Sequence, residues 1–250
     1  MPVIGVAQVH VVPSFKDFQK SVGKEIDGAA GSPQIKKSGG RIGSTLKGAA
    51  VAGVAGTGAL LGTALTKGFG RLTAIENARG KLVGLGHDAK SVETIMTNAT
   101  SSVKGTAFGL DEAATVAANA VAAGVKPGKD LERTLKLVAD ASTIAGTDMA
   151  SMGAIFNKAA SSNKVQMDVI NQLHDAGVPA LALIADQMGV TAEEAAKMAS
   201  KGEVDFATFQ AAMEKGMGGA ALESGKTLQG AFKNSMAAIG RFGANLLDGV

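Results

Sequence analysis

The residues Ala220 to Thr227, AALESGKT, are the segment whose residue types could bind a phosphate group. They fit a relaxed phosphate-loop pattern, in which backbone N–H groups and a lysine surround the phosphates. Such a loop needs a strand before it, whereas the residues preceding Ala220 predict a helix, and Ala220 stands where the first glycine is required. Nucleotide hydrolysis through Lys226 and Thr227 is therefore the weakest of three functional hypotheses.

The histidines form no constellation that could bind a metal or activate a nucleophile. The chain has three histidines and no cysteine. His87 adjoins Asp88 and His174 adjoins Asp175, but neighbours along a helix do not face one another. His10 lies on a predicted strand with no partner ligand. We therefore assign no catalytic, cofactor-binding or metal-binding residue, and we expect that the protein is not an enzyme.

An uncharged segment from Gly48 to Thr66, GAAVAGVAGTGALLGTALT, is the main candidate for function. It is just long enough to span a bilayer, and small residues recur four positions apart, which lets helix backbones approach closely. Two readings stay open: a helix that self-associates or is buried in a soluble assembly, and a helix that enters a membrane. The residues expected to carry either contact, with the lysines as flanking anchors, are Lys47, Gly48, Gly53, Gly56, Gly58, Gly62 and Lys67.

Two short sections precede this segment in the predicted organisation, and the segment itself lies in a third. Residues 1–27 begin with β-branched residues that predict one short strand, ended by Pro13, and a short helix follows. Residues 28–44 are rich in Gly, Ser and Lys and predict a flexible linker. Residues 45–70 form the Gly/Ala-rich apolar helix.

Residues 71–250 predict a multi-helix globular domain, so the fold class is mainly α. Expected N-caps are Asp88, Asp111 and Asp205, and Thr191 with Glu194 forms a predicted capping box. Glycines at 86, 124, 177, 189 and 202 are expected to end helices. The expected helices are 71–85, 88–101, 111–124, 129–145, 148–161, 165–176, 179–188, 191–200, 205–216 and 221–247.

The helix at 129–145 shows the expected separation of faces. Its residues Leu131, Leu135, Val138 and Ile144 should point to the core, whereas Glu132, Arg133, Lys136 and Asp140 should largely face water.

Composition limits how the core can be built. The chain has 46% hydrophobic residues and 34 Gly but no Trp or Tyr, so helices must approach closely through small residues, with ten Met filling gaps.

The net charge is +3, and residues 1–81 hold 11 Lys+Arg against 4 Asp+Glu. These charges are dispersed, so we expect no sequence-specific nucleic-acid partner. The first residues lack a basic n-region, and we expect synthesis in the cytoplasm.

From Arg71 onward the sequence resembles the tape measure proteins of siphophages and of prophages of actinobacteria. The resemblance lies in RLTAIENARGKLVGLG (71–86), in SVKGTAFGLDEAATVAANAVAAGVKPGKDLERTLKLVADASTIAG (102–146) and in the run from Phe156 to Gly216. The opening VHVVPSFKDFQKSVGKEI (9–26), followed by a Gly-rich apolar segment, is also typical of that family.

The resemblance implies a structural virion protein of the tail lumen that templates tail-tube assembly, sets tail length and takes part in genome ejection. Its implied partners are copies of itself (a homo-oligomer), the major tail tube protein, tail assembly chaperones, tail tip proteins and, on ejection, the host membrane. Family members usually have many hundreds of residues, so we expect this chain to be a fragment or a prophage remnant with the ruler downstream. The alternative hypothesis is a membrane-active helical protein that forms a pore through Gly48–Thr66.

Overall fold

The computed structural model of the chain describes the backbone of residues 55–227 and the side chains of residues 68–227. The predicted N-terminal strand, the short helix after it and the linker at 28–44 lie outside the described residues. The chain divides into two compact units, one of Gly70–Ala237 and one of Met1–Phe69 with Ala238–Val250.

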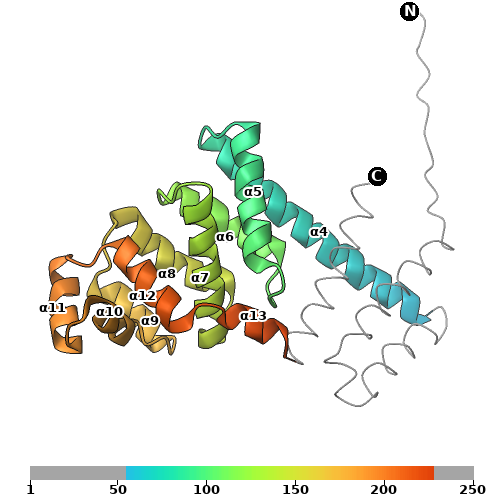
Figure 1. Cartoon of the computed structure of the whole chain (residues 1–250). Helices are drawn as coiled ribbons and strands as arrows, with labels where there is room; N and C mark the ends of the chain where they lie inside the picture. The colour runs from blue at the N-terminus through green and yellow to red at the C-terminus, as the bar shows by residue number, and fades with distance from the viewer. Residues whose placement is uncertain (1–54, 228–250) are drawn as a thin grey trace, which may run out of the picture. The chain divides into compact units, whose positions relative to one another are not determined.

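The described part of the chain consists of ten helices joined by short turns (Figure 1). Its one β-bridge pairs Lys164 with Asp205, where the Val165 N–H donates to the Val204 carbonyl oxygen at 2.8 Å. The predictions of a mainly α chain and of a multi-helix domain are confirmed. The helices are α4 (Ala55–Gly84), α5 (Ala89–Val103), α6 (Leu110–Ala122), α7 (Lys129–Ala145), α8 (Met149–Ser162), α9 (Met167–Asp175), α10 (Ala180–Met188), α11 (Ala192–Lys201), α12 (Phe206–Met217) and α13 (Ala220–Gly225).

Local side-chain caps start several of these helices, as the sequence predicted. The Thr191 hydroxyl accepts from the Glu194 N–H while the Glu194 carboxylate accepts from the Thr191 N–H, which confirms the capping box. Asp88 and Asp205 are confirmed as N-caps of α5 and α12. Each such cap satisfies an N–H group that has no partner within its helix.

Asp111 is not an N-cap, and that prediction was wrong. Helix α6 begins at Leu110, and Gly109 occupies the N-cap position without a side chain to bond. Asp111 lies in the first turn instead, where its Oδ1 is 3.3 Å from Nη1 of Arg71 on α4. A carboxylate in that position still interacts favourably with the positive end of the helix dipole.

Left-handed glycines follow the helices at the predicted places. The five expected glycines at 86, 124, 177, 189 and 202 all have positive φ angles, between +69° and +95°. L-residues with a side chain rarely adopt this conformation, so glycine ends these helices at little cost.

Two helix boundaries differ from the prediction. Helix α4 (Ala55–Gly84) continues through position 71, so the apolar helix predicted at 45–70 and the helix predicted at 71–85 are one element over the described residues. Single glycines weaken a helix by about 1 kcal/mol without necessarily breaking it. Helix α13 ends at Gly225, so the expected helix 221–247 is wrong as a single element. A Cβ at Gly225 would lie 2.2 Å from the Gly105 carbonyl oxygen, and the chain therefore meets another backbone directly where this helix ends.

Helix α7 is the centre of the described domain and packs against α5, α6, α8, α12 and α13 (Figure 1). Leu131, Leu135 and Val138 are fully buried, as predicted. Two other assignments on this helix were wrong: Ile144 is 43% exposed, and Asp140 is only 5% exposed. A second group of helices forms around α10, which packs against α9, α11 and α12.

Small residues bring the core helices close together, as the composition indicated. Helix α6 buries five alanines, and Gly153 of α8 packs directly on Val116 of α6. The largest buried side chains are those of Phe156 and Phe209, whose ring centroids lie 5.1 Å apart between α8 and α12. Tilted aromatic pairs at this distance are favourable beyond the area that they bury.

Candidate functional site

The predicted association segment is described only in part. Lys47, Gly48 and Gly53 lie outside the described residues. Gly56, Gly58, Gly62 and Lys67 lie on α4, but nothing is described of the side chains around them. Among the residues that the structure describes, no helix combines the length and the apolar character needed to cross a membrane.

The segment Ala220–Thr227 has the wrong structure for a phosphate loop. It forms the short helix α13 and a turn, and it follows helix α12 rather than a strand. Nζ of Lys226 is 2.6 Å from Oε1 of Glu223. The N–H groups of Gly219 and Ala221, which would have to face a phosphate, already donate to a carboxylate of this chain. The phosphate-loop reading is therefore not supported.

The two described histidines lie in ordinary positions. Nδ1 of His87 is 3.0 Å from the Ser91 hydroxyl, one turn along the chain, and His174 lies in the last turn of α9. Within residues 68–227 no three His, Cys, Asp or Glu side chains are grouped closely enough to hold a metal ion.

The polar side chain that sequence reasoning missed is Asp140 on α7. Its Oδ2 accepts from the Gly219 N–H at 3.0 Å, and its Oδ1 accepts from the Ala221 N–H at 2.8 Å. Burial raises the pKa of this carboxyl group, although both backbone hydrogen bonds and the nearby charge of Lys136 act to lower it. Asp140 therefore caps α13 from a distant part of the sequence.

A signal for this contact was present in the sequence. Gly218 and Gly219 precede α13 and provide no capping side chain, so the free N–H groups of this helix need an acceptor from elsewhere. The sequence pattern placed Asp140 on the water-facing side of its helix, and only the tertiary fold shows that it is buried and which donors it meets.

Two further polar contacts join α7 to α12. The Gln210 amide Nε2 donates to the Thr134 hydroxyl at 2.8 Å, and both side chains are buried. Nε of Arg133 donates to Oε2 of Glu214 at 2.8 Å, in a more exposed pair. Together with the contacts of Asp140, they attach α12 and α13 to α7.

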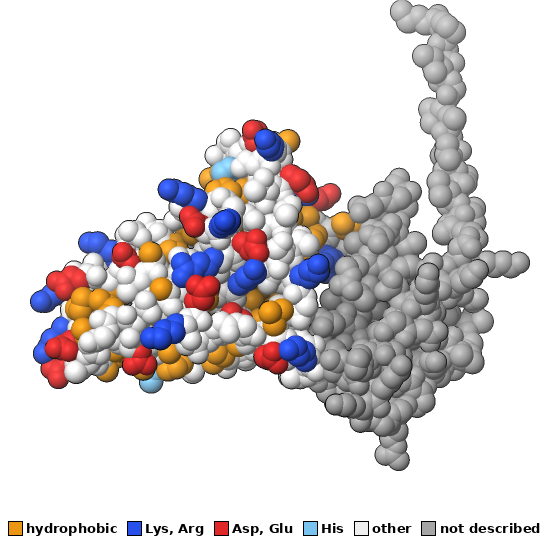
Figure 2. Space-filling model, viewed as in Figure 1, with side chains coloured by type: hydrophobic (Ala, Val, Ile, Leu, Met, Phe, Trp, Pro, Cys, Tyr) orange, Lys and Arg blue, Asp and Glu red, His pale blue; other side chains and the backbone are white. Residues whose placement is uncertain are grey.

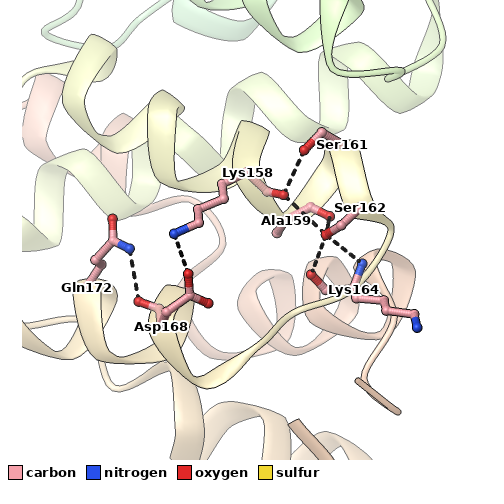
Figure 3. A network of polar contacts seen from close by, with 7 residues as sticks. All are labelled: Lys158, Ala159, Ser161, Ser162, Lys164, Asp168 and Gln172. Carbon is pink, nitrogen blue, oxygen red and sulfur yellow. Dashed lines mark hydrogen bonds and ion pairs between the residues drawn. The ribbon is translucent and has the colours of Figure 1, made fainter. Parts of the chain in front are cut away.

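The junction between α8 and α9 contains a second polar cluster (Figure 3). Lys158 of α8 forms an ion pair with Asp168 in the first turn of α9. This contact with Lys158 is the largest cause that holds the pKa of Asp168 below its usual value. The Ser162 hydroxyl is bonded to the Lys164 N–H at 3.3 Å and to the Lys164 carbonyl oxygen at 3.0 Å. These contacts fix the turn that joins the two helices.

The visible surface carries no extended apolar or single-sign face. Figure 2 shows small groups of apolar side chains between lysines, arginines and acidic residues. The large hydrophobic side chains exposed on the described domain are Val83, Leu85, Ile144 and Leu222. Isolated exposed apolar residues are common on protein surfaces, but they are also the places where a partner could gain contact area.

A family model described as "Tape measure protein" matches residues 61–247. No curated protein and no solved structure matches the chain. The matched range includes every described helix from α5 to α13 and most of α4.

Proposed function

The chain belongs to the tape measure protein family, and on that premise we propose that it lies in the tail lumen of a long-tailed bacteriophage and takes part in tail-tube assembly and in the determination of tail length. The family is structural. The observation that carries the proposal is that the family match extends over three quarters of the chain and includes the packed helical domain. The contacts of Asp140 with the N–H groups at 219 and 221, of Thr134 with Gln210 and of Arg133 with Glu214 join helices of that domain to one another, which supports a scaffolding role.

We propose that residues 70–227 act as an association module rather than as the ruler. A single helix of these residues would be about 240 Å long at about 1.5 Å per residue. Instead they fold back on one another as short helices around α7. The length of such a domain does not grow in proportion to its residues, so it is suited to binding and poorly suited to measuring.

The proposed partners are further copies of this chain, the major tail tube protein, tail assembly chaperones and tail tip proteins. Exposed Val83, Leu85, Ile144 and Leu222 support such contacts. For Gly48–Thr66 we propose self-association during assembly, and contact with the host membrane when the genome is ejected.

Protease protection in purified virions tests the proposed location. Intact particles and particles with opened tails are treated with protease, and peptides from residues 70–227 are quantified by mass spectrometry. A lumenal protein yields these peptides from intact tails and loses them once the tails are opened. Digestion to the same extent in both samples, or absence of the peptides from purified virions, would contradict the proposal.

Light scattering coupled to size exclusion, with and without detergent micelles, tests the role of Gly48–Thr66. A defined oligomer in plain buffer that Gly56→Asp dissociates supports self-association. A chain that is homogeneous only in detergent, and that releases dye from liposomes unless it carries Gly56→Asp, would favour the membrane-active alternative.

A further inference from the structure

Helix α13 is attached to the domain in a different way from its neighbours. It has only six residues, and an isolated helix of that length is unstable in water, so its order depends on tertiary contacts. Its first N–H groups bond to Asp140, and its last residue, Gly225, packs against the backbone of Gly105 and Thr106. Ala221, between these two attachments, is 2% exposed.

The connection before α13 allows it to move separately from α12. Gly218 and Gly219 join the two helices, and Gly219 has a φ of +90° that L-residues rarely adopt. The bonds of Thr134 with Gln210 and of Arg133 with Glu214 hold α12 to α7, and they end before this glycine pair. Rotation at Gly218 and Gly219 therefore leaves the attachment of α12 intact.

We propose that α13 is a latch that opens about Gly218–Gly219 as a unit of its own, and that Asp140 is the residue that holds it closed. In the closed state the Asp140 carboxylate accepts hydrogen bonds from two N–H groups in place of hydrogen bonds from water. Opening returns this carboxylate to water and lets the first turn of α13 unwind. Among the described residues, those from 219 to 227 are then connected to the domain through α12.

The latch can open separately because α13 buries much less apolar surface than α12. Helix α12 buries Phe206, Phe209 and Met213, whereas α13 buries one alanine and leaves Leu222 49% exposed. Local opening begins where few apolar contacts oppose it. Asp140 compensates for that small buried area, because without it the N–H groups of Gly219 and Ala221 would lose their acceptor, and an N–H group buried without an acceptor is costly.

Cysteine labelling of the 250-residue chain tests this proposal directly, since the sequence contains no cysteine. Ala221→Cys places a thiol beneath α13, and Ala212→Cys places a matched thiol, 1% exposed in the native chain, beneath α12. In native buffer we expect the thiol at 221 to react at least about tenfold faster than the thiol at 212. Asp140→Asn should accelerate labelling at 221 by a further factor of about ten or more and leave labelling at 212 unchanged.

Hydrogen exchange on the chain without cysteine substitutions provides the second readout. The peptide that contains α13 should exchange faster than the peptide that contains α12, and Gly219→Ala should accelerate only the former, because a Cβ at that φ strains the closed hinge. Equal labelling rates at 212 and 221, or an Asp140→Asn effect of equal size at both positions, would overturn the proposal. The outcome does not depend on the proposed role in the phage tail.

Discussion

Gly153 of α8 lies so close to Val116 of α6 that a Cβ at position 153 would be 2.7 Å from Cγ1 of Val116. We expect Gly153→Ala to lower the free energy of unfolding by about 1–3 kcal/mol, because the added methyl group overpacks a core with no space for it. Thermal and urea denaturation followed by circular dichroism measure the change.

Gly80→Ala is the matched control for this substitution. A Cβ at Gly80 meets no atom within 4 Å, and the residue is exposed in the interior of α4. Alanine should therefore stabilise the chain by about 0.5–1 kcal/mol through helix propensity. Equal destabilisation by both variants would show that α6 and α8 do not pack as described.

The capping box of α11 should be worth more than an ordinary threonine hydrogen bond. Thr191→Ala removes the acceptor for the Glu194 N–H and should cost about 1 kcal/mol. Thr94→Ala removes a hydroxyl that bonds only the Lys90 carbonyl oxygen one turn back in α5, and we expect it to be neutral or slightly stabilising. Chemical denaturation of both variants gives the comparison, and a Thr94→Ala cost as large as that of Thr191→Ala would contradict it.

For the buried Thr134–Gln210 pair, removing one partner should cost more stability than removing both. Thr134→Val leaves the buried Gln210 amide without its acceptor and should cost about 1–3 kcal/mol. Adding Gln210→Met to Thr134→Val should recover part of that loss, because no buried donor is then left without an acceptor. A double-mutant cycle measures this coupling. The same cycle on the exposed Arg133–Glu214 pair should give no more than about 1 kcal/mol.

Asp205 should make the domain less stable in acid. The Thr208 N–H bonded to its carboxylate holds the pKa of Asp205 below its usual value. Its contribution to stability is therefore present above the unfolded-state pKa of 3.8 and is lost as the pH falls through the lower folded-state pKa. Asp205→Asn keeps a capping oxygen but cannot titrate, so its free energy of unfolding should fall less steeply from about pH 6 to about pH 2.

Asp140 should behave in the opposite sense. Burial raises the pKa of this group in the folded chain, so its contribution to stability is full below pH 3.8 and falls as the pH rises through the raised pKa. The stability difference between the native chain and Asp140→Asn should therefore change in the direction opposite to that of Asp205→Asn. The same titration of both variants against the native chain measures it, and parallel curves would contradict the assigned cause.

Most helix boundaries could be predicted from the sequence, because capping residues and helix-ending glycines lie within a few residues of each boundary. Thr191, Asp205 and the left-handed glycines act on their own helices, and their roles could be read from the sequence. Asp140 could not be placed in this way, since its donors lie about 80 residues further along the chain. The prediction for Asp111 was wrong for a local reason, because α6 begins one residue before it, at Leu110.

The same distinction between local and long-range contacts applies to the candidate site. The missing strand made a phosphate loop at Ala220–Thr227 the weakest of the three hypotheses from the sequence, and the structure places a helix there. The latch at α13 depends on how Gly219, Ala221 and Gly225 meet distant backbone and side-chain groups, and no periodicity or motif indicates such meetings.

Tail length in the phage that encodes this chain tests the central claim most directly. An in-frame deletion of the codons for residues 70–227 is compared with Thr94→Ala, and tails are measured by negative-stain electron microscopy. We expect the deletion to abolish infectious particles and to leave no tails of uniform length, while Thr94→Ala gives native tails. Deletion particles with tails of native length and normal infectivity would contradict the assignment of this domain to tail assembly.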